Sequence, residues 1–275
     1  MVTAPRRAAA AIVAATIACA SGAAFAQDGK IEILWLGQSA MRIKTVTGKV
    51  IVIDPWLTRN PKTPAEYKNL DQIGKMDIIL VTHAHGDHLG DAPDLAKKYN
   101  APVWGPAGLG QSLQTLGILP PALAPRMGKG GTIQPFPKVK ISAVRAEHSS
   151  ELVWRNPATD KDETHVGGEP VGFVIELENG FRIYHMGDTA VFGDMKYIAD
   201  RYKPDLIMIP IGGHFVMSPE DAAYATRDIL KPKHAIPMHY GTNPFLVGTP
   251  EEYIKAMGDA PVKIHNMKPG DKLEL

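Results

Sequence analysis

The segment His83 to His88, His-Ala-His-Gly-Asp-His, places three imidazoles and one carboxylate within six positions. Imidazole and carboxylate together suit zinc, manganese, iron or nickel. The apolar run Asp77 to Val81 comes just before this segment and is typical of a buried strand. The potential ligands therefore lie where a strand gives way to a loop, a common place for active sites in α/β proteins. A histidine-rich solvated turn is the alternative interpretation, and it leaves the further ligands elsewhere in the chain unexplained.

Three more apolar runs each lead to a residue that can bind a metal. Residues 141–144 reach His148, residues 181–186 reach Asp188 through Gly187, and residues 235–238 reach His239. If these strands lie side by side and point the same way, their ends converge on one edge of the sheets. The sequence then predicts seven ligands at that edge: His83, His85, Asp87, His88, His148, Asp188 and His239.

Seven ligands are too many for one zinc ion, and they suit two ions with an open or water-filled position. His83 and His85 alternate in an extended segment, so their side chains point the same way and can share one ion. Asp87 and His88 follow Gly86 and can turn toward a second ion. Two ions about 3.5–4 Å apart would hold a bridging hydroxide, which is a nucleophile at neutral pH.

Together these residues resemble the ligand set of a metallo-β-lactamase superfamily hydrolase. Further segments resemble the UPF0173 branch of metal-dependent hydrolases, akin to the ascorbate-6-phosphate lactonases. The likeness covers nearly all of residues 31–275 and is specific for fold and metal, but it says little about the substrate. The segments that carry the narrower likeness are Trp35–Ser39, Ile53–Pro55, Pro210–Gly213 and Met238–Thr242.

The resemblance implies a division of the ligands between two divalent ions, with zinc as first choice and manganese, iron or nickel as alternatives. His83, His85 and His148 would hold one ion; Asp87, His88 and His239 would hold the other; Asp188 would bridge both. Asp87 would also act catalytically by taking up or giving back a proton. Asp54, at another strand end, would orient a ligand imidazole, or else simply form a turn.

Two departures from the relatives bear on the substrate. The branch usually has His at the position of Gln38, which we expect near the pocket. The cysteine ligand of one class of true β-lactamases is absent, so we do not expect an antibiotic-degrading enzyme. His214 follows Gly212-Gly213 after a strand and is predicted to contact substrate, with a loop histidine as the alternative. Among the remaining histidines, His185 is expected in the core, and His165, His234 and His265 in solvent.

The predicted fold is an α+β (αββα) sandwich, with two mixed β-sheets packed face to face and helices on the outside. Ser218 and Thr249 are predicted to cap helices that begin with proline. Residues 117–137 are expected to be loop, and the polar segment 155–168 a surface loop or a flap over the site. The predicted strands are 31–36, 41–45, 49–53, 77–81, 103–104, 139–144, 171–177, 181–185, 205–209 and 233–238, and helices are expected near 91–99 and 109–116.

The first 26 residues are typical of a Sec-type signal peptide. Arg6 and Arg7 form a basic start, Ala8 to Ala20 an apolar core, and Ala24-Phe25-Ala26 a cleavage site before Gln27. Residues 27–275 then form one hydrolase domain in the periplasm or outside the cell, with no membrane contact after cleavage. Cys19 is the only cysteine, so the mature chain would have no thiolate ligand.

We expect a secreted dinuclear hydrolase that uses a metal-bridging hydroxide on a lactone or other ester-like carbonyl substrate. The alternatives are a phosphodiesterase with the same metal site and a non-catalytic metal-dependent binding protein. The 275-residue chain has a net charge of +1 and no basic block, which favours a small-molecule substrate over nucleic acid. The sequence leaves open whether the chain forms a homo-oligomer.

Overall fold

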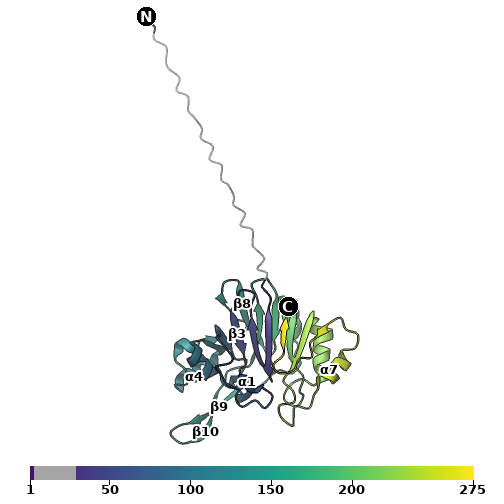
Figure 1. The fold of residues 1–275 in the computed structure, drawn as a ribbon. Coiled ribbons are helices and arrows are strands. Elements are labelled where there is room, and N and C mark those ends of the chain that lie inside the picture. Colours follow the sequence, from purple (N-terminus) through teal and green to yellow (C-terminus); the bar gives the residue numbers. More distant parts are fainter. Residues whose placement is uncertain (3–28) are drawn as a thin grey trace.

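The computed structural model describes residues 1–2 and 29–275. The expected signal peptide, apart from its first two residues, and its cleavage site lie outside the described residues. Residues 29–275 form two packed β-sheets with helices on both outer faces (Figure 1). No helix in this described part is long and apolar enough to cross a membrane.

The first sheet is mixed. Its strands from β16 to β3 are antiparallel neighbours, and those from β3 to β6 run parallel. In spatial order the strands are β16 (Lys272–Glu274), β1 (Glu32–Gly37), β2 (Ala40–Lys44), β3 (Val50–Ile53), β4 (Ile78–Leu80), β5 (Val103–Pro106) and β6 (Arg126–Met127).

The second sheet is also mixed, with parallel pairing from β15 to β12 and antiparallel pairing from β12 to β7. In spatial order its strands are β15 (Lys263–Ile264), β14 (His234–Met238), β13 (Leu206–Pro210), β12 (Arg182–His185), β11 (Val171–Glu176), β8 (Val139–Arg145) and β7 (Thr132–Phe136). The carboxyl ends of its parallel strands β12 and β14 lie at the same edge as that of β4 in the first sheet, because the residues that follow them lie together.

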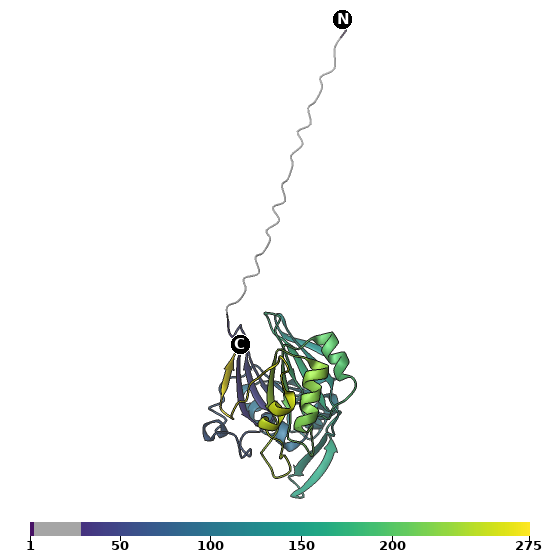
Figure 2. The same ribbon diagram turned by 90° about the vertical axis from the view of Figure 1, so that its right-hand side faces the viewer.

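Helices cover both outer faces, so the predicted αββα sandwich is confirmed. The helices α3 (Ala92–Tyr99) and α4 (Ala107–Thr115) lie outside the first sheet. The second sheet is covered by α5 (Met195–Tyr202), α6 (Pro219–Tyr224) with the π-helical continuation η2 (Ala225–Leu230), and α7 (Pro250–Met257) (Figure 2). Short helices α1 (Ala65–Lys68), α2 (Gly86–Leu89) and η1 (Pro121–Leu123) lie in the loops.

Side-chain alternation along the strands builds this sandwich. Ile33 and Trp35 of β1 point into the core between the sheets, whereas Leu34 and Leu36 pack toward the helices. Successive residues of a strand face opposite sides, so a strand between two buried layers must be apolar at every position. The near-continuous apolar runs in the sequence reflect this arrangement.

Two predicted loops contain regular structure instead. Residues 117–137 include η1, β6 and β7, and residues 155–168 belong to a two-stranded hairpin, β9 (Glu151–Asn156) and β10 (Lys161–Val166). The hairpin forms because Leu152 and Trp154, two residues apart, pack against the α3 and α4 side of the first sheet. Helix α5 and the short strands β15 and β16 are further elements that the sequence prediction missed.

Both predicted helix caps are confirmed. The backbone amide of Asp221 donates to Ser218 Oγ at 3.1 Å at the start of α6. At α7, Thr249 and Glu252 form a reciprocal capping box, with 3.2 Å from the Glu252 amide to Thr249 Oγ1 and 3.0 Å from the Thr249 amide to Glu252 Oε2. These contacts satisfy amides that have no partner within the helix.

The substitution Thr249→Ala should lower the free energy of unfolding by about 0.5–2 kcal/mol, because it removes the hydroxyl that caps α7. Urea denaturation of the variant and the parent measures this difference. Thr249→Ser keeps the hydroxyl and should stay close to the parent. Equal losses in both variants would contradict the capping role.

His234 and His265 were predicted to be solvated, and this was wrong. Both are half-buried, and His234 Nδ1 lies 3.0 Å from His265 Nε2 across the β14–β15 pair. Burial, with the nearby charges of His234 and Lys263, lowers the pKa of His265 to about 4. The folded protein therefore binds fewer protons than the unfolded chain between about pH 6.5 and pH 4.

Stability should accordingly fall as the pH drops from about 6.5 toward 4, because protonation of His265 favours the unfolded chain. His265→Gln should lose less thermal stability than the parent between pH 7.5 and pH 5, measured by calorimetry with a chelator present throughout. Asn266→Gln is the neutral control next in sequence. An unchanged pH dependence in His265→Gln would contradict this assignment.

Candidate metal centre

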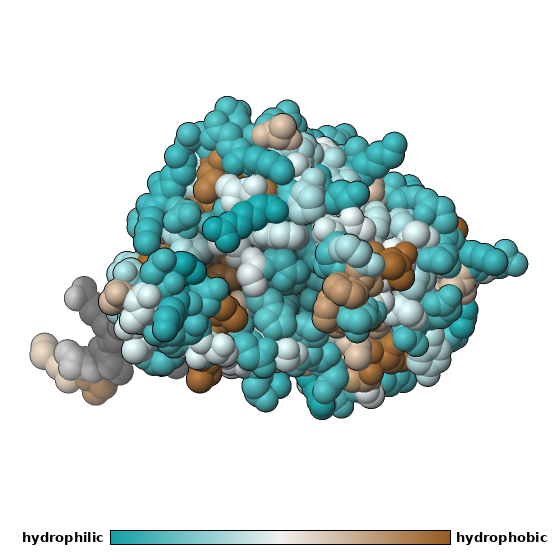
Figure 3. Space-filling view, turned by 90° about the horizontal axis from the view of Figure 1, so that it is seen from below, coloured by the Kyte–Doolittle hydropathy of each residue, from teal (hydrophilic) through white to brown (hydrophobic). Residues whose placement is uncertain are grey.

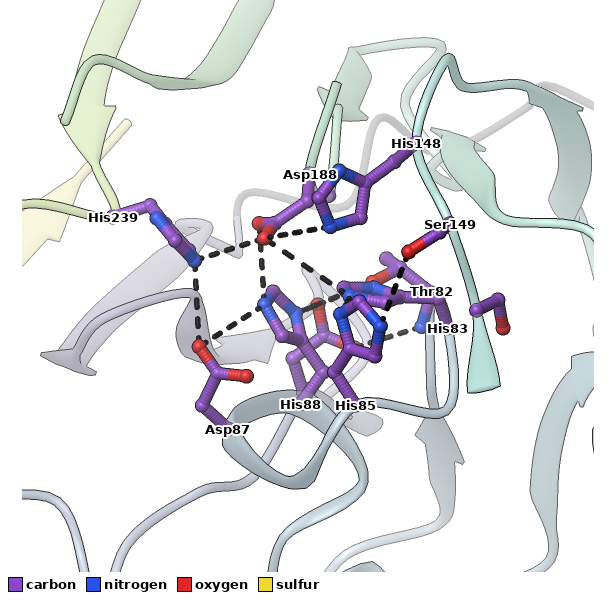
Figure 4. Close-up of polar contacts among 12 residues, drawn as sticks. Thr82, His83, His85, Asp87, His88, His148, Ser149, Asp188 and His239 are labelled. Carbon is purple, nitrogen blue, oxygen red and sulfur yellow. Dashed lines mark hydrogen bonds and ion pairs between the residues drawn. The ribbon is translucent and has the colours of Figure 1, made fainter. Parts of the chain in front are cut away.

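The histidine-rich segment leaves the first sheet at the end of β4 and turns at once into the four-residue helix α2. His83 and His85 precede the helix, and His83 Nε2 lies 3.0 Å from His85 Nδ1. Asp87 and His88 lie on α2 and point to the other side of the cluster (Figure 4). The expected separation into two pairs follows from this change from extended to helical backbone.

The second sheet supplies the other three residues at the ends of its strands. His148 follows β8, Asp188 follows β12 and His239 follows β14. All three point at the α2 segment (Figure 4). The structure therefore brings all seven predicted ligands together.

Three sets of possible donor atoms lie within 4.8 Å of one another. They comprise His83, His85 and His148; Asp87, His88 and His239; and a central set of His83, His88 and Asp188. The first two sets are those implied for the two ions.

Asp188 lies close to four of the five imidazoles of the cluster. Its Oδ2 lies 2.9 Å from His239 Nε2, 3.6 Å from His148 Nε2 and 4.0 Å from His83 Nε2. Its Oδ1 lies 3.1 Å from His88 Nε2. Oδ2 thus lies near residues of both outer sets and Oδ1 faces His88 of the second set, so the carboxylate stands between the two sets.

Polar atoms without a hydrogen-bond partner support a cation at this place. Within residues 29–275, His88 Nε2 and Asp188 Oδ1 are buried and lie 3.1 Å apart, and neither has a hydrogen-bond partner of good geometry. Buried polar groups left unpaired are costly and call for an explanation. A divalent cation between them would satisfy both, and the imidazole and carboxylate donors suit zinc and its neighbours.

The charges of the cluster are strongly coupled. Burial lowers the pKa of His83 well below its usual value, which keeps this imidazole neutral. Burial also lowers the pKa of His88 and His239, but the neighbouring carboxylates, chiefly Asp188, outweigh it. They raise the pKa of His88 well above its usual value and that of His239 to about 9. At Asp188 burial is outweighed by His239 and His88, which hold its pKa well below the usual range. The pocket therefore favours positive charge around an ionised Asp188.

Asp54 orients His88 as expected. Its Oδ2 lies 2.8 Å from His88 Nδ1, and the carboxylate also accepts the Thr82 amide at 2.8 Å and the Thr82 hydroxyl at 2.7 Å. The side chain is fully buried, and its backbone is left-handed, with φ of 47°. Holding Nδ1 in this way directs Nε2 toward the centre. The opposed reading of Asp54 as only a turn residue is thus disfavoured.

Other contacts with the ligands were not predicted. His85 Nε2 lies 3.2 Å from Glu151 Oε2 of the β9–β10 hairpin and 3.4 Å from Ser149 Oγ. Thr82 Oγ1 lies 3.1 Å from His83 Nδ1. The hairpin therefore meets the metal centre at its first residue.

Gln38 lies beside the second set of donors. Its amide nitrogen donates to Asp87 Oδ2 at 2.9 Å and lies 2.8 Å from His239 Nε2. Its carbonyl oxygen accepts the Thr242 hydroxyl at 2.6 Å. The expectation that position 38 lies near the pocket agrees with this placement.

A cavity with a volume of about 420 Å³ opens onto the cluster. No lysine or arginine lines it in the described part of the chain. Its walls are formed by Gln38, Trp56, His85, Asp87, His148, Ser149, Asp188, Phe215, His239 and Asn243.

His214 does not line this cavity. It is exposed, with a left-handed φ of 56°, and its ring packs on Phe215, which does line the cavity. Phe215 was not predicted, although it follows His214 in the loop that begins with Gly212 and Gly213. His185 is buried, with Nε2 2.9 Å from the Ser39 carbonyl oxygen, as expected of a core histidine.

Comparisons with known proteins agree with this site. The model of the beta-lactamase superfamily domain matches residues 49–240. A UPF0173 metal-dependent hydrolase from Polaromonas sp. (strain JS666) is 63% identical over 247 residues, which cover 90% of each chain. A second, from Cupriavidus necator, is 60% identical over 250 residues, covering 90% of this chain and 86% of the relative.

Among solved structures, Igni18, a metallo hydrolase from the hyperthermophilic archaeon Ignicoccus hospitalis, superimposes with a TM-score of 0.75 at 30% identity. The match covers 90% of this chain and 98% of the other. The family model, the relatives and the superimposed fold all indicate the same family. The chain therefore belongs to the beta-lactamase superfamily and, within it, to the UPF0173 metal-dependent hydrolases.

Proposed function

We propose that this metal-dependent hydrolase uses two divalent ions to cleave a lactone or other ester-like carbonyl substrate. The observation that carries the proposal is the pair of donor sets that both contact Asp188, one through His148 and the other through His239 and His88. Two ions, when bound, supply an activated water as nucleophile and polarise the substrate carbonyl. Zinc is the first choice, with manganese, iron or nickel as alternatives.

In this proposal the protein's own groups position the reacting atoms. His83, His85 and His148 hold one ion, and Asp87, His88 and His239 hold the other. The Asp188 side chain is 4% exposed, and it fixes the distance between the two sets. Rigid, buried polar groups of this kind stabilise the charge that develops in the transition state.

Asp87 is the proposed proton carrier. Its side chain is 32% exposed and lines the cavity, whereas His88 beside it is fully buried. Its Oδ2 accepts from Gln38, which leaves Oδ1 to carry a proton. A carboxylate in this position can take a proton from the attacking water and return it to the leaving oxygen.

A carbonyl substrate is favoured over a phosphodiester by the cavity walls. Phosphate recognition draws on arginine and lysine side chains, and neither lines the cavity in the described part of the chain. The non-catalytic binding alternative is disfavoured by membership in a hydrolase family. A hydrolysis screen of lactones, phosphodiesters and β-lactams with metal-loaded protein tests the assignment. Phosphodiester cleavage without lactone cleavage would overturn it.

Asp188→Asn should remove the charged bridge, so bound metal should fall from about two ions per chain toward one, and turnover by at least about a hundredfold. Mass spectrometry of the metals and steady-state kinetics measure the two effects. Asp200→Asn is the control, because Asp200 is an exposed carboxylate paired with Lys196. Full metal content and full activity in Asp188→Asn would refute the bridging role.

We also propose that the protein is exported to the periplasm or beyond. The support is the leader-like sequence of residues 1–26. Intact-mass measurement on protein expressed in a Gram-negative host should give a chain that starts at Gln27. A chain retained in the cytoplasm and starting at Met1 would contradict export.

A further inference from the structure

Hydrophobic side chains gather beside the metal cavity on two loops that follow strands of the second sheet. Phe215, after β13, is 50% exposed, and Phe245 and Val247, after β14, are 58% and 74% exposed. Figure 3 looks onto the lower face of the molecule and shows hydrophobic side chains clustered on its right-hand side. Such exposed clusters on an otherwise polar surface mark binding sites.

The aromatic rings pack together rather than standing singly. The His214 ring stacks on Phe245, with centroids 4.9 Å apart and an interplanar angle of 24°. The Phe215 ring lies edge-on to His214 at 4.3 Å and to Phe245 at 6.1 Å. These rings form one continuous surface, which we call the aromatic rim.

The aromatic rim is continuous with the reaction site. Phe215 lines the same cavity as Asp188 and His239, and Trp56 lines it as well. A molecule whose reacting group lies over the metal centre can therefore place its remainder against Phe215 and the rest of the rim.

Backbone contacts hold both rim loops in place. The Gly213 amide donates to the Met217 carbonyl at 2.9 Å, and the Met217 amide donates to the Thr189 carbonyl at 3.2 Å, next to the ligand Asp188. In the second loop the Gly241 amide donates to the carbonyl of Leu246, a buried residue, at 3.0 Å. The rim is thus preformed, which lowers the entropic cost of binding.

We propose that the aromatic rim binds an apolar substituent of the substrate, so that the enzyme prefers neutral lactones or esters with a medium-length alkyl or an aryl group. This inference rests on the proposed function and adds the substrate class. Burial of each methylene group contributes about 0.8 kcal/mol when complete, equivalent to about a fourfold gain in affinity. The absence of lysine and arginine from the cavity walls in the described chain agrees with a neutral substrate.

Two lactones with the same ring test the proposal. γ-Decanolactone carries a six-carbon chain that γ-butyrolactone lacks, and the metal-loaded enzyme should show at least about a tenfold higher kcat/KM for it. The double substitution Phe215→Ala with Phe245→Ala should reduce this ratio at least about fivefold, mainly through KM. Both rings are half-exposed, so the variant should fold, and its thermal melt checks this.

Tyr224→Ala is the matched control. Tyr224 ends α6, is 49% exposed and does not line the cavity, so its loss should leave the ratio of the two lactones unchanged. Leucine at positions 215 and 245 keeps an apolar surface and should retain part of the preference. Hydrolysis of both lactones at similar rates, or a preference that survives the double alanine substitution, would overturn the inference and leave the proposed function intact.

A binding measurement separates this inference from the proposed function. Calorimetry should show decanoate binding to the metal-loaded protein at least about tenfold more tightly than butyrate, with a smaller difference in the double alanine variant. If neither these lactones nor any other ester is hydrolysed, the proposed function fails, and these affinities alone decide whether the rim binds alkyl groups. Equal affinities for decanoate and butyrate would then reject the rim as well.

Discussion

The structure depends on the burial of one carboxylate, Asp188, within a ring of imidazoles. A buried anion is costly unless it is paired, and here His239 and His88 lie within 3.1 Å of its oxygens. The ligands come from both sheets, so the cluster ties the two halves of the sandwich together at one edge. The packed core between the sheets fixes the strand ends and therefore the spacing of the donors.

Much of the fold and of the donor set could be predicted because both depend on local patterns. Apolar runs mark buried strands, and residues just after strands that run in the same direction meet at one edge, which brought His148, Asp188 and His239 to the α2 segment. Contacts between distant segments were harder to predict. Glu151 reaches His85 only because an unpredicted hairpin forms, and the hairpin depends on side chains packing against another layer.

The same limit explains the other differences between prediction and structure. β15 and β16 have two and three residues, too few for a periodic pattern to appear. His234 and His265 meet because β14 and β15 pair in parallel, a register that neither segment encodes by itself. Phe215 was missed because an aromatic residue in a loop has no distinctive spacing, and only the cavity shows what it faces.

The donor set contains only nitrogen and oxygen atoms, and this affects how the metal centre withstands oxidation. Thiolate ligands are converted by peroxide to sulfenic and higher acids, which releases the metal. The seven donor residues, Asp188 among them, offer imidazole and carboxylate groups alone, which are far less susceptible to that chemistry. The centre is therefore suited to surroundings in which reactive oxygen species would disable a cysteine-ligated enzyme.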